Sequence, residues 1–214
     1  SPLLSNIILN KLDKELEARS LNFVRYADDI IILVKSEKAA NRVMASITDY
    51  IERKLGLKAN MTKTKVCKPN ELKYLGFGFY KSNKYEVIPH KESKAKFKRK
   101  LKGLTKRSES ISLDKRFERL NWLIRGWVNY FKMSKMKKFL TQIDKWLRTR
   151  IRMIIWKMWK LPKTRALNLM KCGINKDEAT RTAYSRKGYY ALARTFQLGS
   201  SISKRRLSKP NKTK

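Results

Sequence analysis

Histidine and cysteine are nearly absent from this 214-residue chain, which has one histidine, His90, and two cysteines, Cys67 and Cys172. A zinc finger, a zinc nuclease centre or a disulfide framework needs more of these residues than the chain contains. Catalysis by a Ser–His–Asp or Cys–His arrangement is nearly excluded too, since His90 would have to serve alone. The scarcity of cysteine makes a reducing compartment the expected location.

Long apolar runs and acidic residues are scarce as well. The longest unbroken apolar run, residues 30–34, is far too short for a membrane span, and the N-terminus lacks a signal-peptide pattern. Only 17 acidic residues oppose 53 Lys and Arg, which leaves a formal net charge of +36. A charge of this size indicates an anionic polymer as partner. Because the cations alternate with aromatic residues that can stack on bases, we expect nucleic acid rather than a membrane surface.

The charge is unevenly distributed along the chain. Residues 1–90 carry 16 Lys and Arg against 10 Asp and Glu, whereas residues 91–214 carry 37 against 7. The second part therefore holds +30 of the net +36. The local sequence patterns change at the same place, which predicts a domain boundary near Pro89.

Helices and strands alternate in the first part. Ser1 can cap a helix that has Pro2 at its first position, and Gly56 is a stop signal for another. Two apolar, β-prone runs around the pair Asp28–Asp29 predict a hairpin whose turn is that pair. We expect a helix with Leu4, Ile8, Leu12 and Leu16 on its inner face, strands at 23–27 and 30–34, a helix at 37–55, and strands at 57–60, 65–68, 74–80 and 85–88.

The pattern after Pro89 is helical. In the second of the predicted helices, Leu120, Ile124, Trp127 and Phe131 share one face, which predicts a core stripe. From about Gly199 onward, apolar residues are few, and we expect disorder in the absence of a partner. The predicted helices lie near 91–107, 113–131, 135–159, 162–171 and 176–185.

Two adjacent carboxylates at a tight hairpin are the most informative feature. Asp28 and Asp29 repel each other, and a cation between them relieves that repulsion. Hard oxygen ligands suit Mg²⁺, which takes one or two carboxylates together with water and substrate phosphates. Two such metals clamp the attacking and leaving oxygens in nucleotidyl transfer. The simpler interpretation is a surface hairpin with two solvated Asp residues.

Four segments in order resemble motifs of group II intron reverse transcriptases. Residues 23–29, Phe-Val-Arg-Tyr-Ala-Asp-Asp, resemble the catalytic Tyr-x-Asp-Asp motif, and residues 1–7 with Leu12-Asp13 resemble the end of the preceding motif, whose Pro-Gln-Gly start would precede Ser1. Residues 60–65 are similar to the lysine-bearing motif, and residues 75–77 to the primer-grip hairpin. Residues 119–131 resemble the maturase (thumb, or X) signature, and residues 185–190 resemble the segment beyond it.

The resemblance implies an α+β fold, namely a partial right-hand polymerase palm with an antiparallel sheet and helices, followed by an all-α basic thumb/maturase domain. The implied domains are a palm at 1–89 that lacks the fingers and first palm motif, a thumb/X domain at 90–160, and a basic RNA- or DNA-binding segment at 161–214. The implied location is bacterial cytoplasm or an organelle. The implied function is RNA-directed DNA synthesis and splicing assistance.

Site roles follow from the same resemblance. Asp28 and Asp29 are the expected catalytic Mg²⁺ ligands, with Mn²⁺ as a substitute, and Lys63 or Lys65 would assist the departing pyrophosphate unless both are merely solvated. The family uses a third Asp that is not among these residues, so we expect no polymerase activity from this chain alone. The expected primer- and template-binding residues are Ser1, Pro2, Asn6, Tyr26, Leu75, Gly76 and Phe77.

The expected partners are structured intron RNA, an RNA template with a DNA primer, deoxynucleoside triphosphates and target DNA. Aromatics such as Trp127 have a competing interpretation, because Trp127 shares a helical face with core residues. For the cations, the competing interpretation is a solvated helix surface. The RNA-binding candidates are Arg125, Trp127, Tyr130, Arg148, Arg150, Arg152, Lys204, Arg205 and Arg206.

Three other functions compete with the polymerase and maturase. A non-enzymatic splicing factor would keep the palm as a scaffold, but it has no need of a repulsive Asp28–Asp29 turn. A retron or CRISPR-associated reverse transcriptase fits the Arg125-Gly126-Trp127 segment and the basic helices less well. A simple basic DNA-binding protein leaves the hairpin unexplained.

Overall fold

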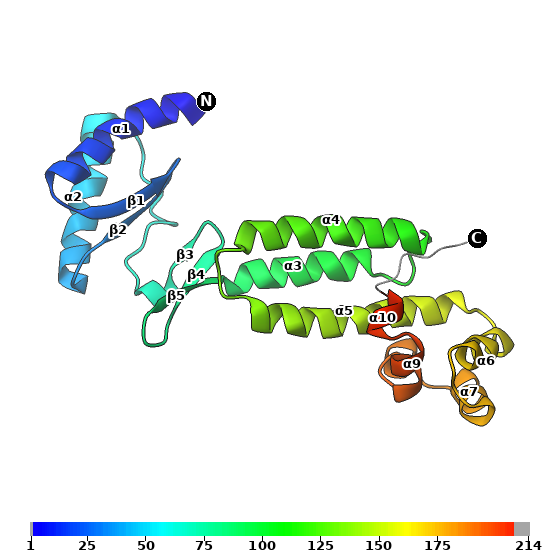
Figure 1. Cartoon of the computed structure of the whole chain (residues 1–214). Helices are drawn as coiled ribbons and strands as arrows, with labels where there is room; N and C mark the ends of the chain where they lie inside the picture. Colours follow the sequence, from blue (N-terminus) through cyan, green and yellow to red (C-terminus); the bar gives the residue numbers. More distant parts are fainter. Residues whose placement is uncertain (1, 208–214) are drawn as a thin grey trace. The chain divides into compact units, whose positions relative to one another are not determined.

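The computed structural model describes residues 2–207 and has an α+β fold (Figure 1). The chain forms two compact units, Ser1–Leu75 and Gly76–Lys214, which we call unit 1 and unit 2. The boundary between the two units, after Leu75, precedes the change in charge near Pro89 in the sequence. Among the described residues, none of the helices combines the length and hydrophobicity needed to cross a membrane.

Unit 1 consists of a β-hairpin and two long helices around one small core. Leu12 and Leu16 of the first helix and Ile47 of the second are buried there, together with the inner face of the hairpin. The expected stripe on the first helix is only half correct, because Leu4 and Ile8 are exposed. The elements are α1 (Pro2–Ala18), β1 (Asn22–Tyr26), β2 (Asp29–Leu33), α2 (Glu37–Leu55), a 3₁₀ turn (Pro69–Glu71) and β3 (Lys73–Tyr74).

The predicted helix at 37–55 is confirmed as α2, and local chemistry explains both of its ends. Ser36 accepts a hydrogen bond from the Ala39 backbone N–H at 3.2 Å, which caps the first turn. Gly56 adopts a left-handed conformation with φ of 64°, which ends the helix at little steric cost. Val43, Ile51 and Leu55 pack against the core.

The hairpin is confirmed, but its turn lies one residue earlier than predicted. Tyr26 pairs with Asp29, so the turn consists of Ala27 and Asp28, and Asp29 begins β2. Ala27 takes the left-handed conformation, with φ of 53°. A short side chain at this position lessens the steric cost of that conformation.

The predicted strands at 57–60 and 65–68 are wrong, because neither segment pairs as a strand. The side chain of Asn60 instead accepts hydrogen bonds from the Thr62 and Lys63 backbone N–H groups, at 3.2 and 3.3 Å. Such an Asn-centred turn competes with strand pairing. The predicted strand at 74–80 is interrupted at Leu75 and Gly76, where φ is 48° and 80°.

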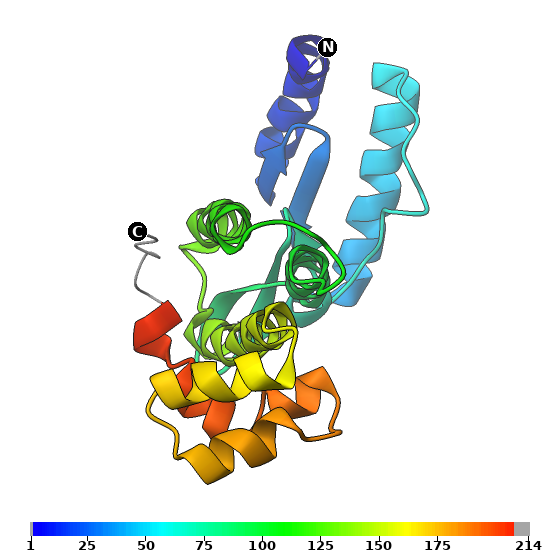
Figure 2. The same ribbon diagram turned by 90° about the vertical axis from the view of Figure 1, so that its right-hand side faces the viewer.

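Unit 2 begins with a hairpin and continues with three long helices that lie side by side (Figures 1 and 2). In the hairpin, Gly78 pairs with Ile88, and in the helices Phe97, Leu101, Leu120, Ile143, Leu147 and Ile151 form a buried core. The elements are β4 (Phe77–Lys81), β5 (Tyr85–Pro89), α3 (Lys91–Leu104), α4 (Leu113–Phe131) and α5 (Lys137–Met158).

A second core in unit 2 surrounds Trp156 near the end of α5. Leu169, Ala179, Leu192 and Leu198 pack with it. Five short helices complete the described chain, namely α6 (Pro162–Lys171), α7 (Lys176–Ala183), α8 (Tyr189–Leu192), α9 (Phe196–Ser201) and α10 (Lys204–Leu207). The core around Trp156 gathers four of the five, α6 to α9, whereas Leu207 of α10 packs against the first core.

The predicted helices agree with the structure most closely for α4 and α6, whereas α3 ends earlier, at Leu104. Disorder from Gly199 onward is wrong as far as Leu207, since α9 and α10 cover most of this segment. Leu198 and Ser201 are completely buried and Ile202 is 5% exposed. The remainder of the predicted disordered tail, 208–214, lies outside the described residues.

Candidate functional site

Asp28 and Asp29 lie at the exposed end of the β1–β2 hairpin. Asp28 occupies the turn and Asp29 is the first residue of β2, and both side chains are exposed. The paired backbone on either side fixes where the two residues emerge. The two carboxylates that sequence reasoning singled out are therefore presented together to solvent at a strand end.

Arg25 connects this turn to helix α1. Its Nε and Nη2 donate to Asp13 Oδ1 and Oδ2 at 2.7 and 2.5 Å, in a two-point contact. Its Nη1 donates to Asn6 Oδ1 and to the Ala27 carbonyl oxygen, both at 2.9 Å. Because the Arg25 and Asp13 side chains are only 14% and 21% exposed, solvent screens the pair weakly. One guanidinium thus joins two turns of α1 to the residue that precedes Asp28.

Tyr74 borders the same hairpin. Its hydroxyl donates to the Asp29 carbonyl oxygen at 3.4 Å. Burial raises the pKa of Tyr74 above its ordinary value of 10.0, and the negative charge of Asp29 raises it further. The hydrogen bond to Asp13 raises the pKa of Arg25, against the effect of its burial. Tyr74 is therefore held neutral and Arg25 charged around the turn.

The donor set fits part of a magnesium site. Two exposed carboxylates supply the hard oxygen ligands that Mg²⁺ takes from proteins, while water and phosphate complete its coordination. In the described part of the chain, no group of three or more His, Cys, Asp or Glu side chains gathers where it could hold a metal. The turn thus offers two ligands and leaves the others to come from elsewhere.

The two candidate lysines lie on the turn built by Asn60. The Lys63 and Thr64 backbone N–H groups donate to the Asn60 carbonyl oxygen at 3.1 and 3.0 Å, which fixes the backbone at Lys63. The side chains of Lys63 and Lys65 are exposed. Their role at a departing pyrophosphate stays a prediction.

The candidate primer- and template-binding residues fall into several settings. Asn6 holds Arg25, Tyr26 is 64% exposed, and Pro2 begins α1, while Ser1 lies outside the described residues. Leu75 and Gly76 form the left-handed turn before β4. The positive φ of Gly76 favours glycine, and a Cβ there would also stand 3.0 Å from Ser93 Oγ, which is tighter than most such contacts. Phe77 stacks on Tyr130, with ring centroids 5.6 Å apart.

Four of the candidate RNA-binding residues are arginines that form hydrogen bonds or ion pairs inside unit 2. Arg150 donates to the Thr105 side chain and backbone at 2.6 and 2.9 Å, and Arg152 donates to the Ile202 and Gly199 carbonyls at 3.0 and 3.2 Å. Burial lowers the pKa of both arginines. The other two are Arg148, paired with Asp144 at 3.1 Å, and Arg206, which donates to the Ser201 carbonyl at 2.7 Å.

The other candidates divide into core and surface. Trp127 stacks on Phe97 with centroids 4.4 Å apart and packs against the first core of unit 2. Arg125, Lys204 and Arg205 are exposed, and Tyr130 is 56% exposed. These four residues, together with Arg206, which is also exposed, are the accessible members of the predicted RNA-binding set.

Two residues of interest were missed. Arg25 was seen only as part of a motif, because its partners Asp13 and Asn6 are distant in sequence. Trp122 is 75% exposed on α4 and was not distinguished from the core tryptophans, although it lies off the apolar face of Leu120, Ile124 and Trp127. That helical offset was the signal available in the sequence.

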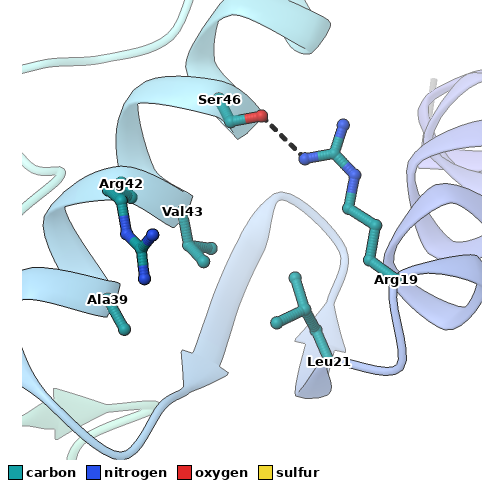
Figure 3. A pocket seen from close by; sticks show the side chains of 6 residues that line it. All are labelled: Arg19, Leu21, Ala39, Arg42, Val43 and Ser46. Carbon is teal, nitrogen blue, oxygen red and sulfur yellow. Dashed lines mark hydrogen bonds between the residues drawn. The ribbon is translucent and has the colours of Figure 1, made fainter.

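A groove of about 280 Å³ in unit 1 is a separate feature (Figure 3). Arg19 crosses it and donates to Ser46 Oγ at 2.8 Å, which joins the segment after α1 to α2. Arg19 also pairs with Glu15 at 2.7 Å. None of the residues that line the groove belongs to the predicted site, and Arg19 acts as a structural link. The lining residues are Arg19, Leu21, Ala39, Arg42, Val43 and Ser46.

Comparisons with known proteins agree with these features. Residues 1–79 match the family described as reverse transcriptase (RNA-dependent DNA polymerase). Residues 94–173 match the family described as group II intron, maturase-specific domain. A search of curated proteins found no match. The two families occur in one chain, in this order, and together the two matches agree with a group II intron reverse transcriptase/maturase.

Proposed function

We propose that the Asp28–Asp29 turn contributes two carboxylates to the magnesium site of an RNA-directed DNA polymerase. The observation that carries this proposal is the exposed carboxylate pair on a turn that Arg25 ties to α1. A solvated surface turn would need no such tie. The family match over residues 1–79 supports the same assignment.

Each residue around the turn has a distinct task in this proposal. Asp28 and Asp29 would hold Mg²⁺, which supplies charge neutralisation at the attacking and leaving oxygens. Arg25 is a positioning residue, because it fixes the Ala27 carbonyl and thereby the backbone before Asp28. Lys63 and Lys65 would offer positive charge to the departing pyrophosphate.

The residues of this chain supply only part of the polymerase. Nucleotidyl transfer with two metals uses more carboxylate ligands than the turn provides, and the described residues gather no third one there. We therefore expect no DNA synthesis from this chain alone. A primer-extension assay with Mg²⁺ and deoxynucleoside triphosphates tests this, and robust synthesis would contradict it.

Unit 2 would bind the intron RNA that the maturase family serves. Residues 91–214 carry +30, and like charges at this density destabilise a compact state unless an anion neutralises them. RNA phosphates provide that neutralisation. RNA template with DNA primer, deoxynucleoside triphosphates and target DNA are the further proposed partners.

One binding experiment separates the two parts of the proposal. The affinity for an RNA template with a DNA primer is measured with and without Mg²⁺, for the wild type and for a variant with Asp28→Asn and Asp29→Asn. We expect Mg²⁺ to strengthen binding only in the wild type, while structured intron RNA binds both proteins equally. An identical Mg²⁺ response in both proteins would contradict the metal site. Wild-type protein that fails to bind intron RNA would contradict the maturase role.

A further inference from the structure

Trp122 stands out on α4 because it is a large apolar side chain directed to solvent. It is 75% exposed, whereas Trp127, five residues later, is stacked on Phe97 in the core. The core contacts of α4 include Phe117, Leu120, Leu123, Ile124 and Trp127. The indole of Trp122 therefore contributes little to folding and is accessible to a ligand.

A hollow of about 460 Å³ lies beside Trp122. This volume is within the range of small-molecule sites. Its lining joins apolar, cationic and acidic side chains, since it consists of Leu104, Lys115, Glu118, Arg119, Trp122 and Leu123. The mixture suits a ligand that has a flat apolar ring, hydrogen-bonding edges and a negative charge.

Gly126 lies one helical turn beyond Trp122 on the same side of α4. A Cβ added to it would meet no atom within 4 Å, so no contact within the protein requires glycine there. Glycine inside a helix costs about 1 kcal/mol relative to alanine. The absence of a side chain at Gly126 is explained if the backbone of a bound ligand approaches the helix closely at this position. Arg125, next to it, is exposed.

We propose that α4 carries a site for one unpaired RNA nucleotide, whose base stacks on Trp122 in the hollow. The adjoining sugar–phosphate passes over Gly126, and Lys115, Arg119 and Arg125 are near enough on the helix to receive its phosphates. This inference rests on the proposed RNA-binding function and names its recognition chemistry. RNA is the fitting occupant, because unpaired bases stack on aromatic side chains while phosphates complement the cations.

Arg119 retains hydrogen-bond donors that can contact such a ligand. Its Nη1 donates to Glu109 at 3.3 Å, which engages only part of the guanidinium. The buried Arg116, in contrast, is committed to the Leu104 and Glu109 carbonyls, which hold the segment between α3 and α4. Arg116 therefore shapes one edge of the hollow, and Arg119 is available to the phosphate.

The first test replaces the aromatic ring. Single-stranded oligoadenylate is titrated into the wild type, Trp122→Leu and Trp122→Phe, with unfolding temperatures measured for each protein. Loss of one stacked base should weaken binding roughly tenfold for Trp122→Leu, with a smaller loss for Trp122→Phe. Phe196→Leu is the matched control, since Phe196 is 78% exposed on α9. It should bind like the wild type.

The results discriminate among the possible failures. If the wild type binds oligoadenylate and structured intron RNA and Trp122→Leu binds both equally well, the site is wrong while the proposed function stands. If the wild type binds neither, the proposed function fails with it. A fully paired RNA–DNA hybrid should be insensitive to Trp122→Leu, and an equal loss with the hybrid would overturn base stacking.

The second test concerns the glycine. Gly126→Leu introduces a good helix former into open space, so unfolding should shift to higher temperature while oligoadenylate binding weakens. Gly103→Leu in α3 is the matched control, because a Cβ there also meets no atom within 4 Å. It should leave binding unchanged. Unchanged binding by Gly126→Leu would contradict the close approach of the nucleotide backbone.

Discussion

Arg25 contacts Asp13 through two parallel hydrogen bonds, of 2.7 Å from Nε and 2.5 Å from Nη2. The same guanidinium holds the carbonyl oxygen of Ala27, the residue before Asp28. The position of the carboxylate pair thus depends on a side chain with no chemistry of its own at the site.

Arg25→Lys keeps the positive charge and removes the planar two-point contact. Because both partners are mostly buried, we expect the free energy of unfolding to fall by about 2 kcal/mol. Denaturant unfolding measures this change. Arg53→Lys is the control, since the Arg53–Asp49 pair is 79% and 54% exposed and contributes at most about 0.5 kcal/mol. Equal effects of the two substitutions would show that the contact has no special role.

The raised pKa of Tyr74 predicts a stability loss in alkali. The unfolded chain ionises this tyrosine near its ordinary value of 10.0, whereas the folded chain ionises it at higher pH. The contribution of Tyr74 is therefore complete below pH 10.0 and decreases as the pH rises through the folded pKa. The unfolding free energies of the wild type and Tyr74→Phe should converge or cross over that interval. A difference that does not change with pH would contradict the burial of this hydroxyl.

Exposed cations of unit 2 should determine the salt dependence of RNA binding. Each phosphate contact on a single strand contributes about 0.7 to the slope of log affinity against log salt. Replacing Lys204 and Arg205 by Gln should reduce the slope by about 1 to 2 in total. Filter binding at a series of salt concentrations measures it. An affinity that hardly responds to salt in the wild type would contradict the phosphate account.

Arg150→Gln should affect stability and leave the salt dependence of RNA binding unchanged. Arg150 joins α5 to Thr105 at the end of α3, and burial lowers the pKa of this arginine. We expect the variant to lose about 1 to 3 kcal/mol of stability, as a charged hydrogen bond is removed. Its salt slope should match that of the wild type. A reduced slope without loss of stability would indicate instead that Arg150 contacts RNA phosphates.

Local signals in the sequence predicted much of the fold. Ser36 and Gly56 mark the ends of α2, and the apolar runs around Asp28 and Asp29 mark the hairpin. Competing local chemistry explains the failures. Asn60 builds a turn where strands were expected. Helix α9 continues past Gly199 because Leu198, just before this glycine, is buried in the core of Trp156, and Ile202 after it is only 5% exposed.

The carboxylate pair of the candidate site could be predicted from the sequence, whereas the side-chain contacts that position it could not. Asp28 and Asp29 are adjacent in sequence, but Arg25 reaches Asp13 and Asn6, which only folding brings near. The sequence gives the number of cations but does not show which of them are exposed. Arg150 has internal partners that form only on folding, whereas Arg205 is exposed. Helical spacing could have separated Trp127, on the apolar face, from Trp122, which lies off that face.

The central claim is that the Asp28–Asp29 turn holds magnesium, and metal-directed cleavage tests it most directly. Fe²⁺ with ascorbate and peroxide cuts the backbone close to a bound metal, and the fragments locate that metal. We predict cuts around residues 26–30 that Mg²⁺ suppresses and that disappear when Asp28 and Asp29 are both replaced by Asn, while Asp49→Asn leaves them unchanged. Cuts that persist in the double variant, or that fall only elsewhere in the chain, would contradict the account.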